Sequence, residues 1–88
     1  MPTVHTERLL PVRLFAHMRA LANADSVTVS LPDQSSDQGI LAAVAAAHPA
    51  LAANCRACRV AVDDRFIRGA VALSADSRID LIPPVSGG

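Results

Sequence analysis

The chain has 88 residues, 51% of them hydrophobic and 18% charged, and its eight arginines balance eight carboxylates without any lysine. It is too apolar for a disordered chain. With no net charge, no Trp and no Tyr, it offers neither the basic face nor the stacking platform of a nucleic-acid binder. The longest apolar run, residues 40–47, is too short to span a membrane, which takes about 20 residues. The first five residues lack a basic region followed by an apolar core, so we expect no signal peptide. We expect one small cytoplasmic domain with no nucleic acid and no membrane as partner.

The first part of the chain predicts two strands around a short helix. In chain order we expect an N-terminal lead-in (1–10), a strand (11–15), a short helix (16–23), a strand (26–31) and a polar loop (32–36). In the first strand, Val12 and Leu14 share one face, while Arg13 and Phe15 share the other. The second strand has the clearest signal, because apolar and polar residues alternate along its whole length.

The main helix is predicted over residues 36–48. Ser35 is the expected N-cap, because Gln38 stands three residues later and completes the spacing of a capping box. The apolar residues that follow recur at helical spacing and form one face: Ile40, Ala43, Val44 and Ala47. The helix must weaken at His48, because Pro49 disfavours the helical conformation of the residue before it.

The second part of the chain predicts short elements. They are an irregular stretch or short helical turn (50–57), a strand (59–63), a turn (63–65), two ambiguous segments (66–67 and 70–73) and a last strand (78–82). This order is typical of an α+β domain in which one helix covers one face of a single sheet. We assign residues 11–82 to the domain and residues 83–88 to an extended C-terminal tail.

The tail carries the strongest chemical signal. Pro83 and Pro84 remove two backbone donors and hold the chain extended just beyond the final strand. Ser86, Gly87 and Gly88 then add almost no side-chain bulk. Such a tail can thread a narrow channel and present its α-carboxylate. A frayed terminus is the alternative, but the stiff prolines directly after a strand favour a tail that leaves the domain in a defined direction.

The ending Leu81-Ile82-Pro83-Pro84-Val85-Ser86-Gly87-Gly88 resembles the MoaD/ThiS family of ubiquitin-like sulfur carriers, and its Pro-Pro is most like the molybdopterin synthase branch. Three internal segments are similar to the same family: Val12-Arg13-Leu14-Phe15-Ala16 with Arg19 beyond it, Ala61-Val62-Asp63, and Leu73-Ser74-Ala75-Asp76. The sequence departs from the family pattern in three ways. Asp63 replaces an Asn, Ile82 stands where an aromatic residue is frequent, and a Gly-Asp turn is lost.

The resemblance implies a ubiquitin-like β-grasp fold and the role of sulfur carrier subunit of molybdopterin synthase, in molybdenum cofactor biosynthesis. A ubiquitin-activating-like adenylyltransferase would use ATP to adenylate Gly88. A sulfur donor protein would then convert the acyl-adenylate to a thiocarboxylate. The synthase large subunit, as part of a heterotetramer, would use that sulfur on the cyclic pyranopterin precursor. The carrier itself would bind no cofactor and no metal and supply no acid or base, so Gly87 and Gly88 form its reactive end.

Three other functions remain open at this point. One is a sulfur carrier for thiamine, cysteine or a secondary metabolite. Another is a ubiquitin-like protein modifier whose Gly-Gly forms an isopeptide bond with a target lysine. The third is an interaction module with an inert tail.

Strand periodicity also predicts a docking surface. If Val12, Leu14, Ile79 and Leu81 pack under the helix, then Phe15 and Ile82 lie on the bare face of the sheet, and Phe66 can join them. An exposed apolar patch beside the tail marks a docking surface. The alternative places Phe66 in the core and covers Phe15 by local chain. We also expect Arg19, Pro83 and Pro84 to contact the partner.

The remaining chemical groups favour structural roles. Cys55-Arg56-Ala57-Cys58 is a C-x-x-C motif, but a zinc site needs four ligands and only His48 is close in sequence. A redox motif is expected at a helix start, whereas this one precedes a strand. We predict two small buried thiols, with a sulfur relay or a disulfide as the alternative. We assign structural or surface roles to the other candidates: His17, His48, Asp63, Asp64, Arg56, Arg59, Arg65 and Arg68.

Overall fold

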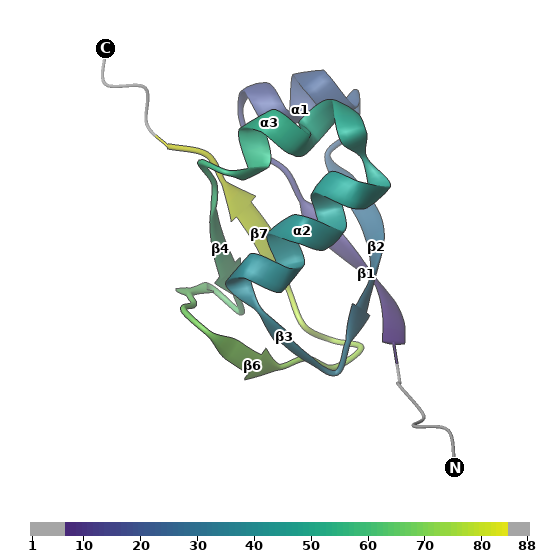
Figure 1. The fold of residues 1–88 in the computed structure, drawn as a ribbon, viewed down its shortest axis with the longest axis vertical. Helices are drawn as coiled ribbons and strands as arrows, with labels where there is room; N and C mark the ends of the chain where they lie inside the picture. The colour runs from purple at the N-terminus through teal and green to yellow at the C-terminus, as the bar shows by residue number, and fades with distance from the viewer. Residues whose placement is uncertain (1–6, 85–88) are drawn as a thin grey trace.

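Five strands form the main sheet of the computed structural model, which describes residues 7–84 (Figure 1). In spatial order they are β2 (Ser26–Pro32), β1 (Glu7–Arg13), β7 (Ile79–Ile82), β4 (Arg59–Val62) and β5 (Arg65–Phe66). β1 and β7 run parallel, and the other neighbours are antiparallel. A separate two-stranded ladder joins β3 (Gln34–Ser36) to β6 (Ala70–Ala72). The predicted α+β class and the mixed sheet are confirmed.

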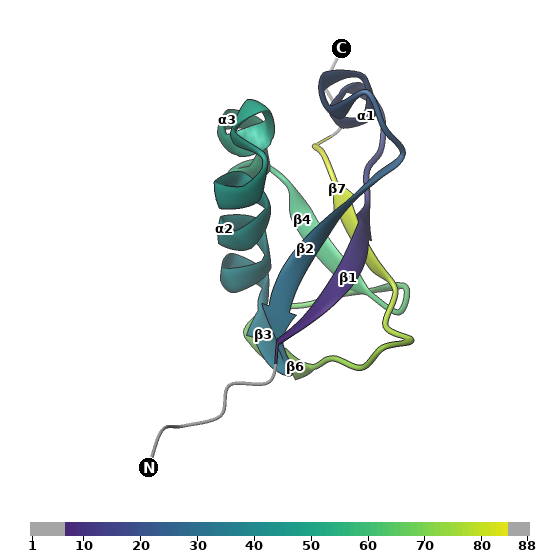
Figure 2. The ribbon, with the colours of Figure 1, turned by 90° about the vertical axis from the view of Figure 1, so that its right-hand side faces the viewer.

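Helices cover one face of this sheet and leave the other bare (Figure 2). They are α2 (Asp37–Ala47), the 3-10 turn η1 (Pro49–Leu51) and α3 (Ala52–Cys55). The short helix α1 (His17–Ala22) lies at the end of the sheet where β1 stops. α2 crosses the sheet, and η1 and α3 continue from its end over the same face. Within residues 7–84, no helix has the length and hydrophobicity to cross a membrane.

The core lies between α2 and the sheet. Every second residue of each central strand points into the core, and Val12, Ile79 and Leu81 are at most 1% exposed. α2 contributes Ile40 and Val44, both fully buried. These positions are the ones that the apolar periodicity assigned to the covered face, so that part of the prediction is confirmed.

The first strand begins earlier than predicted. β1 spans Glu7–Arg13, so residues 7–10 belong to the sheet and not to a lead-in, and the strand ends before Phe15. Pro11 obscured this in the sequence. It is tolerated because β7 pairs with β1 only at Val12 and Arg13, so the missing N–H of Pro11 has no β7 neighbour. At the other end, Ala16 at φ 53° turns the chain into α1.

The N-cap of α2 is Ser36, one residue later than predicted. Its Oγ accepts a hydrogen bond from the Gly39 N–H at 2.9 Å. Ser35 is buried, and its hydroxyl donates instead to the Pro32 carbonyl at 2.8 Å. β3 occupies the segment expected as a polar loop, because residues 34–36 find a ladder partner in β6, far along the chain. Sequence spacing alone does not show such a partner.

Candidate functional site

The bare face of the sheet brings four strands together around Asp80. Asp80 of β7 is level with Arg13 of β1 on one side and with Ala61 of β4 on the other. Ala61 is in turn level with Phe66 of β5. The row Arg13, Asp80, Ala61 and Phe66 therefore crosses the middle of this surface, which we call the open face. Leu9, Phe15, Arg59 and Ile82 belong to the same surface.

An ion pair lies at the centre of the open face. Asp80 is only 7% exposed, and its Oδ1 lies 3.3 Å from Arg13 Nε. The angles do not make a hydrogen bond, so this oxygen has no hydrogen-bond donor among residues 7–84. A buried carboxylate is costly without a counter-charge. The Arg13 guanidinium supplies that charge while its own side chain stays half exposed.

Two aromatic rings flank the ion pair, each beneath an arginine. Phe66 is 51% exposed, and the Arg59 guanidinium carbon lies 3.8 Å from its ring centroid. Phe15 is half-buried, with the Arg13 guanidinium carbon 5.1 Å from its centroid. Phe66 is therefore outside the core, and Phe15 is partly covered by Arg13. Both arrangements suit cation–π attraction, worth about 0.5–1 kcal/mol at exposed sites.

The tail leaves the domain at the edge of the sheet next to Phe15. β1 and β7 are parallel, so their carboxyl ends lie at the same edge of the sheet. Phe15 follows β1 by two residues, and Ile82 ends β7. Ile82 and Pro83 are half-buried, and Pro84 is exposed. Gly87 and Gly88, the predicted reactive end, lie outside the described residues.

Arg19 has a partner within the domain. It sits on α1, and its guanidinium lies 2.8 Å from the Asp25 carboxylate, with both side chains more than half exposed. The salt bridge closes the turn after α1, where Asn23 adopts the left-handed conformation. The structure thus gives Arg19 a local role, and its predicted contact with a partner stays a prediction.

Leu9 is an exposed apolar residue that was not among the predicted docking residues. It is 72% exposed and lies on the same side of β1 as Arg13, two pleats away. The available signal was the alternation of Leu10, Val12 and Leu14, all buried, which places residues 9, 11 and 13 on the other face. Treating the segment as a lead-in hid that pattern.

The C-x-x-C cysteines are buried free thiols, as predicted. Cys55 and Cys58 are 2% and 6% exposed, and the Cys58 thiol donates to the Asn54 carbonyl across 3.4 Å. Burial raises the pKa of both thiols, and the proximity of Cys55 raises that of Cys58 further. Both therefore remain protonated and weakly nucleophilic at neutral pH. Residues 7–84 contain no group of three potential metal ligands.

The carboxylate pair after β4 is a turn, also as predicted. Asp63 and Asp64 both have positive φ, at 51° and 68°. The Asp63 carboxylate accepts from the Arg78 N–H at 3.0 Å, and Asp64 lies 3.6 Å from the Arg78 guanidinium. His17 is exposed and His48 is half-buried. The two carboxylates hold a strand-end turn, and His48 caps the end of α2 through its backbone N–H, so these residues do not converge on a reactive centre.

Two sequence comparisons with known proteins agree with each other. Residues 12–88 match the ThiS family. The chain is 33% identical over 81 residues to the molybdopterin synthase sulfur carrier subunit of Chlamydomonas reinhardtii, covering 90% of this chain and 98% of that protein.

Among solved structures, SAMP1 from Haloferax volcanii superposes with a TM-score of 0.72 at 26% identity, covering 92% of this chain and all of the other. The small archaeal modifier protein 1 from Methanosarcina acetivorans superposes with a TM-score of 0.68 at 19% identity, over 94% of this chain and 99% of the other. The fold is therefore the ubiquitin-like β-grasp that the resemblance implied.

Proposed function

Because the chain belongs to the MoaD/ThiS family of ubiquitin-like sulfur carriers, we propose that the α-carboxylate of Gly88 carries the sulfur as a thiocarboxylate. One observation supports this most directly. β7 ends at Ile82, at the sheet edge beside Phe15, and Pro83-Pro84 come directly after it, so the tail sequence follows immediately on the open face.

The chemistry follows from the reactivity of a carboxylate. A free carboxylate is a poor electrophile, so an activating enzyme joins it to AMP from ATP and releases pyrophosphate. The outer sulfur of a donor protein's persulfide then attacks the acyl-adenylate, and AMP leaves. A thiol next cleaves the S–S bond to the donor, which leaves a thiocarboxylate on the carrier and a disulfide between that thiol and the donor. Its sulfur is a soft nucleophile. After the sulfur has been transferred to the acceptor and water has replaced it, the carboxylate is restored and the cycle can repeat.

The domain contributes position to this cycle. The two prolines fix the direction of the chain where it leaves β7, and the glycines admit the end into a narrow active site. The open face supplies the binding energy that holds the tail there. Leu9 and Phe66, the two most exposed large hydrophobic residues between positions 7 and 84, both lie on that face, which is the distribution expected of a docking surface.

We assign the sulfur to molybdenum cofactor biosynthesis, with the large subunit of molybdopterin synthase as the partner on the open face. The support is the 33% identity to a molybdopterin synthase sulfur carrier subunit across nearly the full length of both chains. The Pro-Pro-Val-Ser-Gly-Gly ending points the same way. Transfer to the cyclic pyranopterin precursor would take place inside that large subunit.

A ubiquitin-like modifier is the second candidate, favoured by the similarity to SAMP1 at 26% identity. The two functions share the acyl-adenylate and part at the next step. A carrier gains sulfur at its end, whereas a modifier forms an isopeptide bond with a lysine of another protein. Because the chain has no lysine, its copies cannot be linked to one another through isopeptide bonds to lysine side chains.

The test is incubation of the purified chain with its activating enzyme, ATP and a sulfur donor, followed by intact-mass spectrometry. We expect one C-terminal oxygen to be replaced by sulfur, and no mass change when Gly88 is deleted. The same reaction in a cell extract distinguishes the modifier, which gives higher-mass conjugates. Conjugates without any thiocarboxylate would contradict the carrier function.

A further inference from the structure

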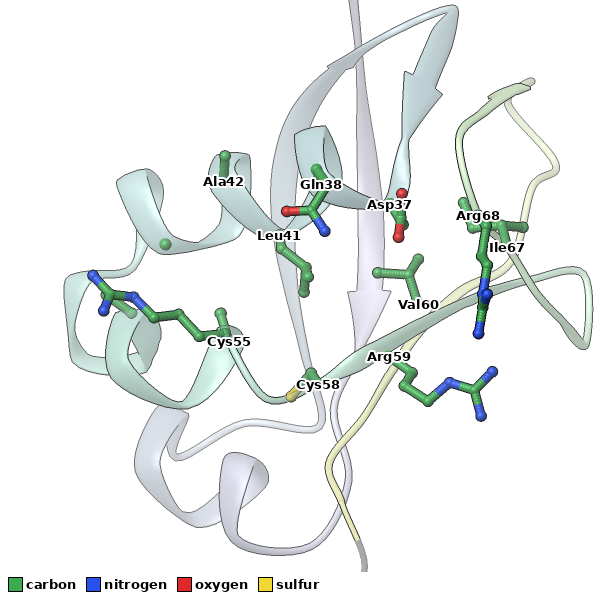
Figure 3. Close-up of a pocket in the computed structure, with 13 residues that line it drawn as sticks. Asp37, Gln38, Leu41, Ala42, Cys55, Cys58, Arg59, Val60, Ile67 and Arg68 are labelled. Carbon is green, nitrogen blue, oxygen red and sulfur yellow. The ribbon is translucent and has the colours of Figure 1, made fainter.

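A groove lies on the helix-covered side of the domain, between α2, α3 and β4, with β4 separating it from most of the open face (Figure 3). It encloses about 420 Å³. Its floor is apolar and includes Leu41, Val60 and Ile67, of which Val60 is buried and the other two are half-buried. Leu41 and Val60 point toward each other across it. The floor therefore suits an apolar side chain from outside the domain.

The rim of the groove is basic. Arg56, Arg59 and Arg68 line it and are all exposed, against the single carboxylate of Asp37. That carboxylate already accepts a hydrogen bond from the Gly69 N–H at 3.2 Å. Figure 3 shows the guanidinium groups of Arg59 and Arg68 directed toward each other at one end of the groove. Two convergent guanidiniums are a favourable site for carboxylates.

This basic rim reflects an uneven distribution of charge over a neutral chain. Four of the eight arginines form ion pairs with carboxylates: Arg8, Arg13, Arg19 and Arg78. The other four have no carboxylate partner among residues 7–84, and all of them fall between positions 56 and 68: Arg56, Arg59, Arg65 and Arg68. The free positive charge is thus collected around β4 and β5, and it complements a negatively charged partner.

We propose that this groove binds an acidic segment of the enzyme that activates the tail, an inference that rests on the proposed function. An apolar side chain flanked by Asp or Glu would fill the floor and meet the rim. A polynucleotide would leave Leu41 and Ile67 uncovered. The activating enzyme also holds ATP, whose phosphates repel the approaching tail carboxylate, and a basic edge on the carrier offsets that repulsion during encounter.

The position of the groove fits a role in presenting the tail. Arg59 lies at the groove and also stacks on Phe66 of the open face, so the two surfaces meet there. Across the sheet, Arg59 is level with Ile82, the last residue of β7 before the tail. A segment bound in the groove therefore holds the enzyme beside the strand from which the tail leaves.

Two arginines provide a matched test. Arg68 lines the groove, Arg65 does not, and both are exposed, three residues apart and without a carboxylate partner among the described residues. Binding of the activating enzyme is measured by isothermal titration for Arg68→Glu, Arg56→Glu and Arg65→Glu. We expect the first two to weaken binding about tenfold at low salt and less at high salt. We expect Arg65→Glu to weaken it about twofold or less.

Each outcome decides the proposal. Unchanged affinity in Arg56→Glu and Arg68→Glu overturns it. An equal loss in Arg65→Glu shows diffuse attraction without a groove contact, and overturns it as well. A single-stranded oligonucleotide that binds with the same dependence on Arg68 overturns the choice of an acidic protein segment. Binding and adenylation are separate readouts, so a wild-type chain that binds without being adenylated contradicts the proposed function and leaves the groove contact standing.

Discussion

Replacing Phe66 by Ala should weaken docking on the open face without unfolding the domain. Phe66 is 51% exposed, so of the roughly 200 Å² that a Phe buries when fully covered, about 100 Å² remains for a partner to cover. At about 25 cal/mol per Å², that area corresponds to about 2.5 kcal/mol. Ala retains a small part of it, so we expect a loss of about 2 kcal/mol, or about 30-fold in Kd.

Leu21 provides the control for this substitution. It is 48% exposed, close to the value for Phe66, but it lies on α1 and not on a strand of the open face. Titration of the synthase large subunit should show the loss for Phe66→Ala and almost none for Leu21→Ala, while both variants melt cooperatively. Equal affinities for Phe66→Ala and the wild type, or an equal loss for Leu21→Ala, would refute the assignment of the docking surface.

Three further outcomes follow from the structure. Arg13→Met should lower the unfolding free energy by about 1–3 kcal/mol, because it leaves the buried Asp80 carboxylate without a counter-charge; adding Asp80→Ala should restore most of that loss in a denaturant titration, and no recovery would count against the ion pair. Ser36→Ala should cost about 1 kcal/mol through loss of the N-cap, measured the same way, and a neutral result would mean that the cap contributes nothing. Burial raises the pKa of Cys55 and Cys58, so the unfolded state loses its thiol protons first as pH rises. Below the ordinary thiol pKa, these thiols should therefore leave the unfolding free energy independent of pH, and above it the unfolding free energy should fall. The fall should be smaller in the variant with both cysteines replaced by Ala. Identical pH profiles for the wild type and this variant would contradict the prediction.

The buried half of the fold could be predicted because it is recorded in local periodicity. Val29 and Leu31 alternate with polar residues, and Ile40 and Val44 repeat at helical spacing, so strand, helix and core faces could be assigned from neighbours in sequence. Pairings between distant segments leave no such local trace. The ladder between β3 and β6 joins residues 34–36 to residues 70–72, and it was expected as a loop and an ambiguous segment.

The tail could be predicted from the sequence more completely than the open face. The tail is a contiguous motif, and its residues identified the family. The open face was predicted through Phe15, Phe66 and Ile82, but not through the arginines that stack on the rings, because those contacts depend on side-chain direction. The basic groove was also missed. It is assembled from α2, α3, β4 and the segment after β5, which only the tertiary fold brings together.

The measurement that bears most directly on the carrier function is sulfur transfer by variants that change only the length of the tail. The complete synthase, built with wild-type carrier, with Gly88 deleted or with one alanine added after Gly88, is supplied with activating enzyme, ATP, sulfur donor and pyranopterin precursor. Deletion leaves the reactive atom one residue short, roughly 3.3–3.6 Å. We predict product only from the wild type, with all three carriers binding the large subunit equally through the open face. Full product from either variant would contradict the claim that the α-carboxylate of Gly88 carries the sulfur.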